Sequence, residues 1–325
     1  MKWLIETNLG PRSAGAIAFG HWLGRKYEGH DIVAIHVAPQ DSATLGHHDY
    51  PGTGARRDRA RATARASVEH WRGPRVFDDV LVLEDDDPAK VVERVAEQLK
   101  FDVLVVGRVG PTDGWSFVNL GRTTRRVLGA MPSPVMVVPP DFDTSGYGDG
   151  PIVVGITADD AAASAVWFAR RMARVLGLPL QMVHVVPPPQ VAPLGTVDPA
   201  VGFALASTSQ RTASQQGDPR IAAWIREQGL QELALRIEIG DPVERLMAVA
   251  ADVDATMIAC GSHEHSWAAQ LLGTSVASRL AAHAKRPTLA VPLGHAPHTA
   301  PVMSSELARA EGEGMVDEVA KVSGV

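Results

Sequence analysis

Cysteine is nearly absent from this chain of 325 residues, which contains Cys260 alone. A single thiol excludes a disulfide within the chain and any metal site built from several cysteines. No apolar run approaches the roughly 18 residues that a membrane-spanning helix needs, and the first apolar stretch, residues 3–5, is too short for a signal peptide. We therefore expect a cytoplasmic protein without membrane contact, in which Cys260 is a packed thiol rather than a redox sensor.

An excess of basic residues is also lacking. Residues 1–150 carry 18 Lys and Arg against 20 Asp and Glu, and residues 151–325 carry 13 against 17, so the net charge of −6 is shared by both halves. Nucleic-acid-binding surfaces need clustered positive charge, and this balance argues against a nucleic-acid partner. Hydrophobic residues at 45% and charged residues at 21% are typical of soluble globular domains.

Several catalytic signatures are missing. The sequence has no Gly-x-Ser-x-Gly elbow and no Walker A loop. The Ser-Gly-Gly-x-Asp-Ser loop of ATP pyrophosphatases and the His-Ile-Gly-His signature of adenylyl transferases are absent too. A true enzyme, such as an ATPase, is therefore the weakest hypothesis, because no general base is positioned by sequence.

The chain does contain an internal repeat. The Asp-Pro pairs at 87–88 and 241–242 align with an offset of 154, which also places Gly107 on Gly261. Elsewhere the offset drifts between 148 and 154, as insertions and deletions in loops would cause. Each Asp-Pro pair is typical of a helix start, with Asp as the cap and Pro at the first helical position.

Each copy alternates short β-branched runs with longer segments of helical periodicity. In the first copy the pattern predicts strands over 2–7, 31–38, 77–83, 103–107 and 135–138, and helices near 12–26, 56–72, 88–100 and 121–130. In the second copy it predicts strands over 152–157, 180–186, 234–239, 256–261 and 289–291, and helices near 160–176, 216–229, 242–252 and 273–285. The alternation indicates an α/β fold of two tandem five-stranded parallel-sheet αβα sandwiches. Spacing leaves the strand order open.

The domain boundaries follow from the same pattern. We expect one domain over 1–144, a second over 145–295 and a C-terminal tail over 296–325. The segment 141–150 is rich in Asp and Gly, as domain links are. A Pro-rich excursion over 187–215 has no counterpart in the first copy.

Ligands of open parallel sheets bind beyond the C-terminal strand ends, so the loop after each fourth strand is the place to search. Glycines there let backbone approach a phosphate, and the next helix N-terminus offers N–H groups. The first copy reads Gly107-Arg108-Val109-Gly110, then ten residues, then Gly121-Arg122-Thr123-Thr124. The second reads Gly261-Ser262-His263-Glu264, then eight residues, then Gly273-Thr274-Ser275-Val276.

These loops and the repeat resemble the universal stress protein family in both copies. Its ATP-binding members carry Gly-x2-Gly-x9-Gly-(Ser/Thr) at this place, where the glycines and the hydroxyl hold the ribose and phosphates. The resemblance implies an adenine-nucleotide alpha hydrolase-like fold. It also implies a stress-response protein that binds ATP, with Mg²⁺, and has little or no catalysis.

Each copy departs from the family pattern in a different part. Arg122 stands where Ser or Thr is expected, and Glu264 replaces the second glycine of the second copy. Family members usually end the first strand with Asp, whereas Thr7-Asn8 and Thr157 hold the matching places here, with Asp159-Asp160 slightly later in the second copy. If one copy alone binds nucleotide, the intact opening glycines favour the first. The candidate binding residues are Asn8, Gly107, Gly110, Gly121, Arg122, Thr123, Thr124, Thr157, Gly261, Ser262, Gly273, Thr274, Ser275 and Val276.

The resemblance also implies that the two copies pair within one chain as a pseudo-symmetric dimer, with the fifth strands as the expected contact. A homodimer of whole chains stays open. The alternative function is a non-enzymatic interaction module of the same fold that has lost nucleotide binding. Arg122, Glu264 and the missing Asp of the first strand motivate this alternative.

Three further clusters have ordinary explanations. The histidines at 47–48 and 263–265 lack third and fourth ligands at a familiar spacing, so we expect solvated or capping side chains rather than a metal site. The five arginines within 56–65 could bind an acidic partner or a polyphosphate, but a solvated helix face is expected. His36 and His184 recur at equivalent strand positions, for which packing is the expected role.

Overall fold

The computed structural model describes residues 1–26, 31–38, 58–59, 62–67, 77–109, 120–144, 147–187, 218–262 and 275–295. These residues form two compact units. The first unit contains the described residues up to Thr144 except Leu120, and the second contains those from Tyr147 onward. Each unit has its own fully buried strands and therefore its own core.

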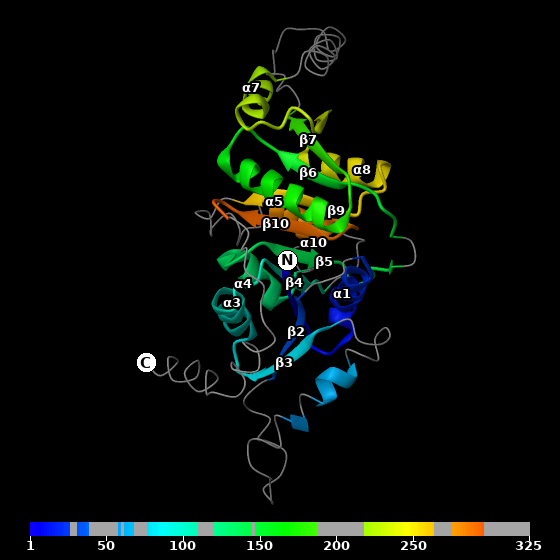
Figure 1. Cartoon of the computed structure of the whole chain (residues 1–325), viewed down its shortest axis with the longest axis vertical. Helices are drawn as coiled ribbons and strands as arrows, with labels where there is room; N and C mark the ends of the chain where they lie inside the picture. The colour runs from blue at the N-terminus through cyan, green and yellow to red at the C-terminus, as the bar shows by residue number, and fades with distance from the viewer. Residues whose placement is uncertain are drawn as a thin grey trace, which may run out of the picture. The chain divides into compact units, whose positions relative to one another are not determined.

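The first unit is a parallel α/β sandwich (Figure 1). Its strands are β1 (Lys2–Glu6), β2 (Asp31–Ala38), β3 (Asp79–Glu84), β4 (Val103–Gly107) and β5 (Val135–Val138), in the order β3-β2-β1-β4-β5. Its helices are the 3-10 turn η1 (Pro11–Ser13), α1 (Ala14–Lys26), α3 (Pro88–Gln98) and α4 (Arg122–Ala130). Helix α1 packs against β1, β4 and β5. Helices α3 and α4 pack against each other, and α3 also packs against β2 and α4 against β5.

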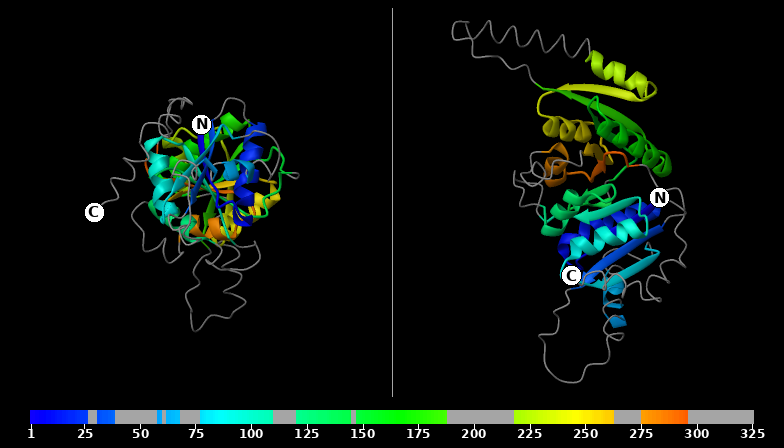
Figure 2. Two further views of the ribbon diagram at one scale, coloured as in Figure 1. Left: turned by 90° about the horizontal axis from the view of Figure 1, so that it is seen from below. Right: turned by 90° about the vertical axis from the view of Figure 1, so that its left-hand side faces the viewer.

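The second unit repeats this plan, with helices on both faces of its sheet (Figure 2). Its strands are β6 (Ile152–Ile156), β7 (Leu180–Val186), β8 (Ala234–Ile239), β9 (Met257–Ser262) and β10 (Thr288–Pro292), in the order β10-β9-β6-β7-β8. Its helices are α5 (Asp160–Leu176), α7 (Pro219–Glu227), α8 (Pro242–Asp252) and α10 (Val276–His283). Helix α5 packs against β6, β9 and β10, α8 against β6, β7 and β9, and α10 against β9 and β10.

The predicted α/β fold is confirmed, and the structure adds the strand order that spacing left open. The paired strands are parallel within each unit. In both units the chain leaves its first strand toward one edge and returns on the other side with its fourth strand. The order therefore reverses between β1 and β4 and between β6 and β9, where open sheets form their ligand crevice.

The two Asp-Pro helix starts are confirmed. Asp87 Oδ1 accepts a hydrogen bond from the Lys90 amide at 3.4 Å. Asp241 Oδ1 accepts from the amides of Val243 and Glu244 at 3.0 and 3.1 Å. The following proline takes the first helical position, where an amide hydrogen would have no partner.

Strand β3 starts two residues later than predicted. Asp78 exchanges bonds with Ile32: its amide donates to the Ile32 carbonyl, and its Oδ2 accepts from the Ile32 amide at 2.7 Å. Phe77 packs against a small buried cluster next to this point. The other strands agree with the prediction to within one residue at each end.

Helix ends differ from the prediction where backbone conformation or capping intervenes. The helix expected near 88–100 ends at Gln98, because Lys100 adopts a left-handed φ of 53°. The helix expected near 216–229 begins after its cap Asp218 and ends before Gly229, whose φ is 65°. Of the helices expected near 56–72 and 273–285, the structure describes residues 58–59 and 62–67 of the first and α10 of the second.

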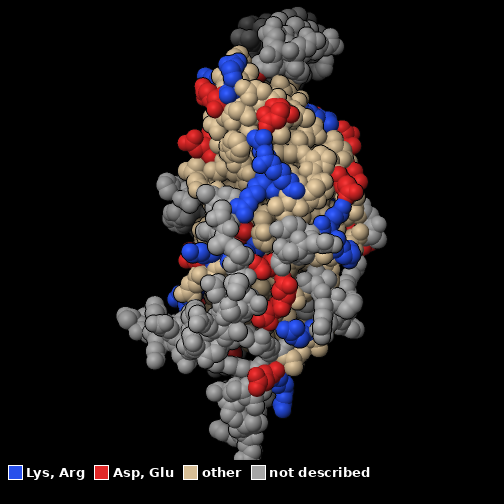
Figure 3. Space-filling model, viewed as in Figure 1, with Lys and Arg blue, Asp and Glu red and all other residues tan. Residues whose placement is uncertain are grey.

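None of the helices in the described ranges is both long and apolar enough to span a membrane. Likewise, no group of three or more His, Cys, Asp or Glu side chains that could hold a metal occurs among the described residues. On the face shown in Figure 3, basic and acidic side chains are interspersed over the described surface.

Candidate nucleotide site

A cavity of about 430 Å³ lies at the C-terminal ends of β6, β7 and β9 in the second unit. Small-molecule sites in proteins usually measure about 300–1,000 Å³, so the cavity can hold a ligand of moderate size. It lies where the strand order reverses, with the first turns of α5, α8 and α10 around it. Its lining residues are Gly155, Ile156, Thr157, Asp159, Ala161, Ala162, Val183, Val185, Pro242, Leu246, Cys260, Gly261, Ser262, Ser275, Val276 and Ala277.

Much of the cavity wall is aliphatic. Val183 and Val185 contribute from β7, and Leu246 faces them from α8. Gly155 of β6 adds no side chain, and a Cβ atom there would lie 2.8 Å from Leu246 Cδ1. This apolar slot suits a flat, weakly polar group such as a heterocyclic base.

The N-terminus of α10 supplies hydrogen-bond donors at the cavity. Ser275 caps the helix: its Oγ accepts from the Ser278 amide at 3.1 Å and donates to Ser278 Oγ at 2.9 Å. The amides of Val276 and Ala277 belong to the first turn, which has no intrahelical acceptors. Together with the positive end of the helix dipole, they favour an anionic group such as a phosphate.

Acceptors lie at the end of β6. Thr157 Oγ1 donates to Asp159 Oδ2 at 2.5 Å, and Asp159 Oδ1 accepts from the Ala162 amide at 2.8 Å as the cap of α5. The carboxylate is thereby fixed in place and disfavours a phosphate next to it. It suits a hydroxyl or amino group of a ligand.

The opening glycine of each sequence motif is required by packing. At Gly261 a Cβ atom would lie 2.3 Å from the carbonyl oxygen of Ala161, and at Gly107 it would lie 2.5 Å from that of Arg12. In both units the backbone at the start of the first helix therefore packs directly against the glycine at the end of the fourth strand, with no side chain between them. These two glycines have a structural reason that does not involve a ligand.

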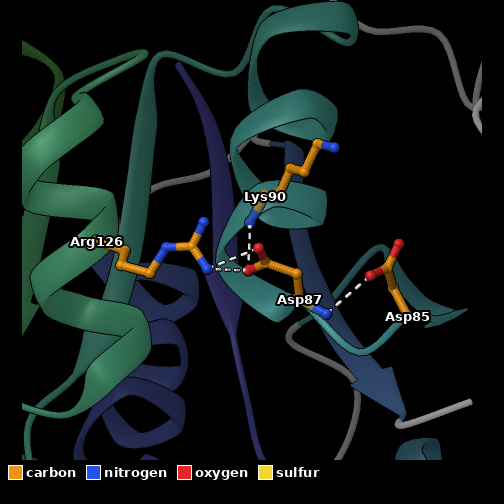
Figure 4. Close-up of polar contacts among 4 residues, drawn as sticks. All are labelled: Asp85, Asp87, Lys90 and Arg126. Carbon is orange, nitrogen blue, oxygen red and sulfur yellow. Dashed lines mark hydrogen bonds and ion pairs between the residues drawn. The ribbon is translucent and has the colours of Figure 1, made fainter. Parts of the chain in front are cut away.

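An arginine joins the last two helices of each unit. Arg279 of α10 donates from both terminal nitrogens to Asp241, the cap of α8, at 2.9 and 3.1 Å. These bonds, with those from the backbone of α8, lower the pKa of Asp241 despite its partial burial. In the first unit Arg126 of α4 donates to both oxygens of Asp87 at 2.6 Å (Figure 4). Sequence reasoning missed both arginines, although they recur at the offset of 153 that relates the ends of the two copies.

A model of the universal stress protein family matches residues 5–139 and matches again at residues 150–292. The chain belongs to the universal stress protein family. The two matches show that it is a tandem member, with one universal stress protein repeat in each unit.

Solved structures support the same fold. A universal stress protein from Archaeoglobus fulgidus is 16% identical, with a TM-score of 0.57 over 90% of this chain and 98% of that one. A putative universal stress protein from Pseudomonas aeruginosa UCBPP-PA14 is 13% identical, with a TM-score of 0.52 over 90% and 92%. At these identities the likeness concerns the fold alone. No curated protein sequence in the comparison matches the chain.

In the second universal stress protein repeat, the structure brings several predicted residues together. Thr157, Gly261, Ser262, Ser275 and Val276 all line the cavity. Gly273 and Thr274, as well as Glu264 and the neighbouring histidines, lie outside the described residues. The aliphatic walls and Asp241 with Arg279 were not predicted as site residues.

In the first repeat, two predicted polar side chains bond to the protein itself. Asn8 Oδ1 accepts from the Gly10 amide at 2.9 Å and from Ser13 Oγ at 2.6 Å, within the turn that leads into α1. Thr124 is buried, and its Oγ1 donates to the Gly107 carbonyl at 2.7 Å. The side-chain amide of Asn8 thus stabilises the turn after β1, and the hydroxyl of Thr124 stabilises the end of β4.

Other predicted residues of the first repeat lie at the start of α4. Gly121 is its N-cap and makes no side-chain capping bond, Arg122 is exposed and Thr123 is half-buried. Gly110 lies outside the described residues, as do His47 and His48.

Cys260 lies in the cavity wall and is buried. Burial raises the pKa of its thiol to about 12. At neutral pH the side chain is therefore a neutral packing group, since the thiolate is the nucleophilic form.

Proposed function

We propose that the second repeat binds an adenine nucleotide, ATP with Mg²⁺ among them, in the cavity at the ends of β6, β7 and β9. The observation that carries this proposal is the polarity of the cavity. The first-turn amides of Val276 and Ala277 offer donors, the carboxylate of Asp159 beside Thr157 offers acceptors at the end of β6, and aliphatic side chains line much of the remaining wall.

This arrangement matches the three chemical parts of a nucleotide. The base fits the aliphatic slot formed with Val183, Val185 and Leu246. The ribose hydroxyls can donate to Asp159, and the phosphates fit the α10 N-terminus, where the dipole and free amides favour negative charge. A divalent cation would be held by the phosphates, because the described residues offer no cluster of metal ligands.

Calorimetric titration of the full chain with ATP and Mg²⁺ tests the proposal, with GTP as the control for the base. We expect Val276→Asp to weaken binding by at least about tenfold, since its carboxylate would repel the phosphates. Acidic residues in a first helical turn stabilise the helix, so the fold should be retained. Val276→Asn has the same shape without the charge and should weaken binding much less.

The matched control is Thr123→Asp in α4. Thr123 is the counterpart of Val276, because both lie three residues before the arginine that bonds the capping Asp. This variant should leave the affinity of the second repeat unchanged. Absence of both heat and a thermal shift at millimolar nucleotide, with every base, would refute the proposed function.

The alternative is an interaction module of the same fold without nucleotide binding. The close approach of Gly107 and Gly261 to backbone carbonyls favours it, because these glycines are explained without a ligand. The ultraviolet spectrum and chromatography of the denatured purified protein discriminate between the two. Co-purified adenine nucleotide excludes the alternative.

A further inference from the structure

Glu6 of β1 occupies the position that Gly155 holds in β6. Strand register shows this equivalence, since Glu6 pairs with Ile35 and Gly155 pairs with Val183. Each partner immediately precedes a histidine. The Nδ1 atom of that histidine bonds the carbonyl oxygen of the residue that follows Glu6 or Gly155. These bonds are His36 to Thr7 at 2.9 Å and His184 to Ile156 at 3.1 Å.

The two positions differ in the side chains that meet between the first strand and the third helix of each repeat. Gly155 lines the cavity, and Leu246 lies so close that a Cβ atom would already conflict with it. The counterpart of Leu246 in α3, counted from the capping Asp, is the fully buried Val92. Valine is one carbon shorter than leucine. The first repeat thus combines a long side chain in the strand with a shorter one in the helix.

Glu6 is half-buried, and its carboxyl group has no hydrogen bond or ion pair to any described residue. Burial raises the pKa of its carboxyl to about 7. A carboxyl group therefore stands in the first repeat at the strand position where the second repeat has a glycine in its cavity wall, packed against Leu246. The volume of the side chain opposes a nucleotide there at any pH, and its negative charge adds to this where the pH exceeds the raised pKa.

We propose that Glu6 closes the first repeat to nucleotides, so that each chain binds one nucleotide and holds it in the second repeat. This inference rests on the proposed function of the cavity. Glu6 would then determine which of the two repeats accepts a nucleotide, because its counterpart Gly155 places no side chain in the cavity of the second repeat. This inference also reverses the expectation from the glycine motifs, which favoured the first repeat.

The test is the number of nucleotides bound per full-length chain, measured by equilibrium dialysis with radiolabelled ATP and Mg²⁺. The wild type should bind one. Glu6→Gly and Glu6→Ala should each bind two, and two variants guard against a folding defect in one of them. Glu84→Gly makes the same substitution at an exposed strand end of the first unit and should still bind one.

Two double variants assign the sites. Glu6→Gly with Thr123→Asp should return to one nucleotide, because the new site loses its phosphate end. Glu6→Gly with Val276→Asp should also bind one, now in the first repeat.

The outcomes separate this inference from the proposed function. A wild type that binds two nucleotides overturns the inference and upholds nucleotide binding. The inference also fails if folded Glu6→Gly and Glu6→Ala still bind one, or if the single wild-type site is lost with Thr123→Asp rather than Val276→Asp. A wild type that binds none contradicts the proposed function, and Glu6→Gly binding one would then still support closure by Glu6.

Discussion

Arg279 and Asp241 form a two-point ion pair that joins the N-terminal half of α10 to the start of α8. The same carboxylate also caps α8, so a single Asp fixes two helices that border the cavity. In the first unit Arg126 and Asp87 repeat this relationship beside Lys90 (Figure 4). The pair holds the helix starts at the edge of the sheet where the cavity lies.

We predict that Arg279→Ala weakens nucleotide binding in the second repeat and destabilises the protein by about 1 kcal/mol, as expected for a partly exposed charge-assisted pair. Because Arg279 lowers the pKa of Asp241, this stability is present above the ordinary Asp range. It is lost as the pH falls through the lowered pKa. Urea unfolding of wild type and variant should therefore converge in acid.

Arg126→Ala is the matched control. It should cost similar stability while leaving the affinity of the second repeat unchanged. Equal loss of nucleotide affinity in both variants would show that the effect is not local to the cavity.

The fold could be predicted from sequence because its signals are local. β-branched runs marked the strands, and the Asp-Pro pairs marked α3 and α8 within the repeat. Strand order could not be predicted, because it depends on which edges pair and not on spacing along the chain.

Of the residues that line the cavity, the sequence predicted mainly the glycines and the residues with hydroxyl groups. Val183 and Leu246 look like ordinary core residues in the sequence, and only the fold shows that they face a cavity. Glu6 resembles a charge at a strand end, and its significance depends on a register match with Gly155. Arg279 was detectable, since it recurs with Arg126, but its partner lies 38 residues away in sequence.

We predict that Gly261→Ala and Gly107→Ala destabilise the protein even without nucleotide. Each new Cβ atom would lie 2.3 or 2.5 Å from a carbonyl oxygen, and relief requires the first helix to move off the sheet. The expected loss is about 1–3 kcal/mol in urea unfolding. Gly129→Ala in α4 is the control: it has open space and should stabilise by up to about 1 kcal/mol. Similar effects at all three positions would contradict the packing explanation.

We predict that Cys260 reacts very slowly in the native protein. With a pKa of about 12, its thiolate fraction at pH 8 is on the order of a thousandfold below that of an ordinary thiol. Iodoacetamide labelling followed by mass spectrometry should show little modification, and denaturation in urea should restore the normal rate. Labelling at the same rate before and after denaturation would show that the thiol is accessible and activated.

The last prediction concerns the pH dependence that Glu6 imposes on stability. Its folded pKa of about 7 lies above the ordinary value of 4.5, so the folded state binds the proton more tightly. Stability from this group is complete below pH 4.5, falls as the pH rises to 7 and then levels off. Glu6→Gln removes the titration, so the variant should match the wild type near pH 4.5 and exceed it by up to about 3 kcal/mol at pH 8. Other titrating groups cancel in the difference between the two proteins. Parallel stability curves from pH 4.5 to 8 would show that Glu6 is solvated, and its closure of the first repeat would then need a purely steric cause.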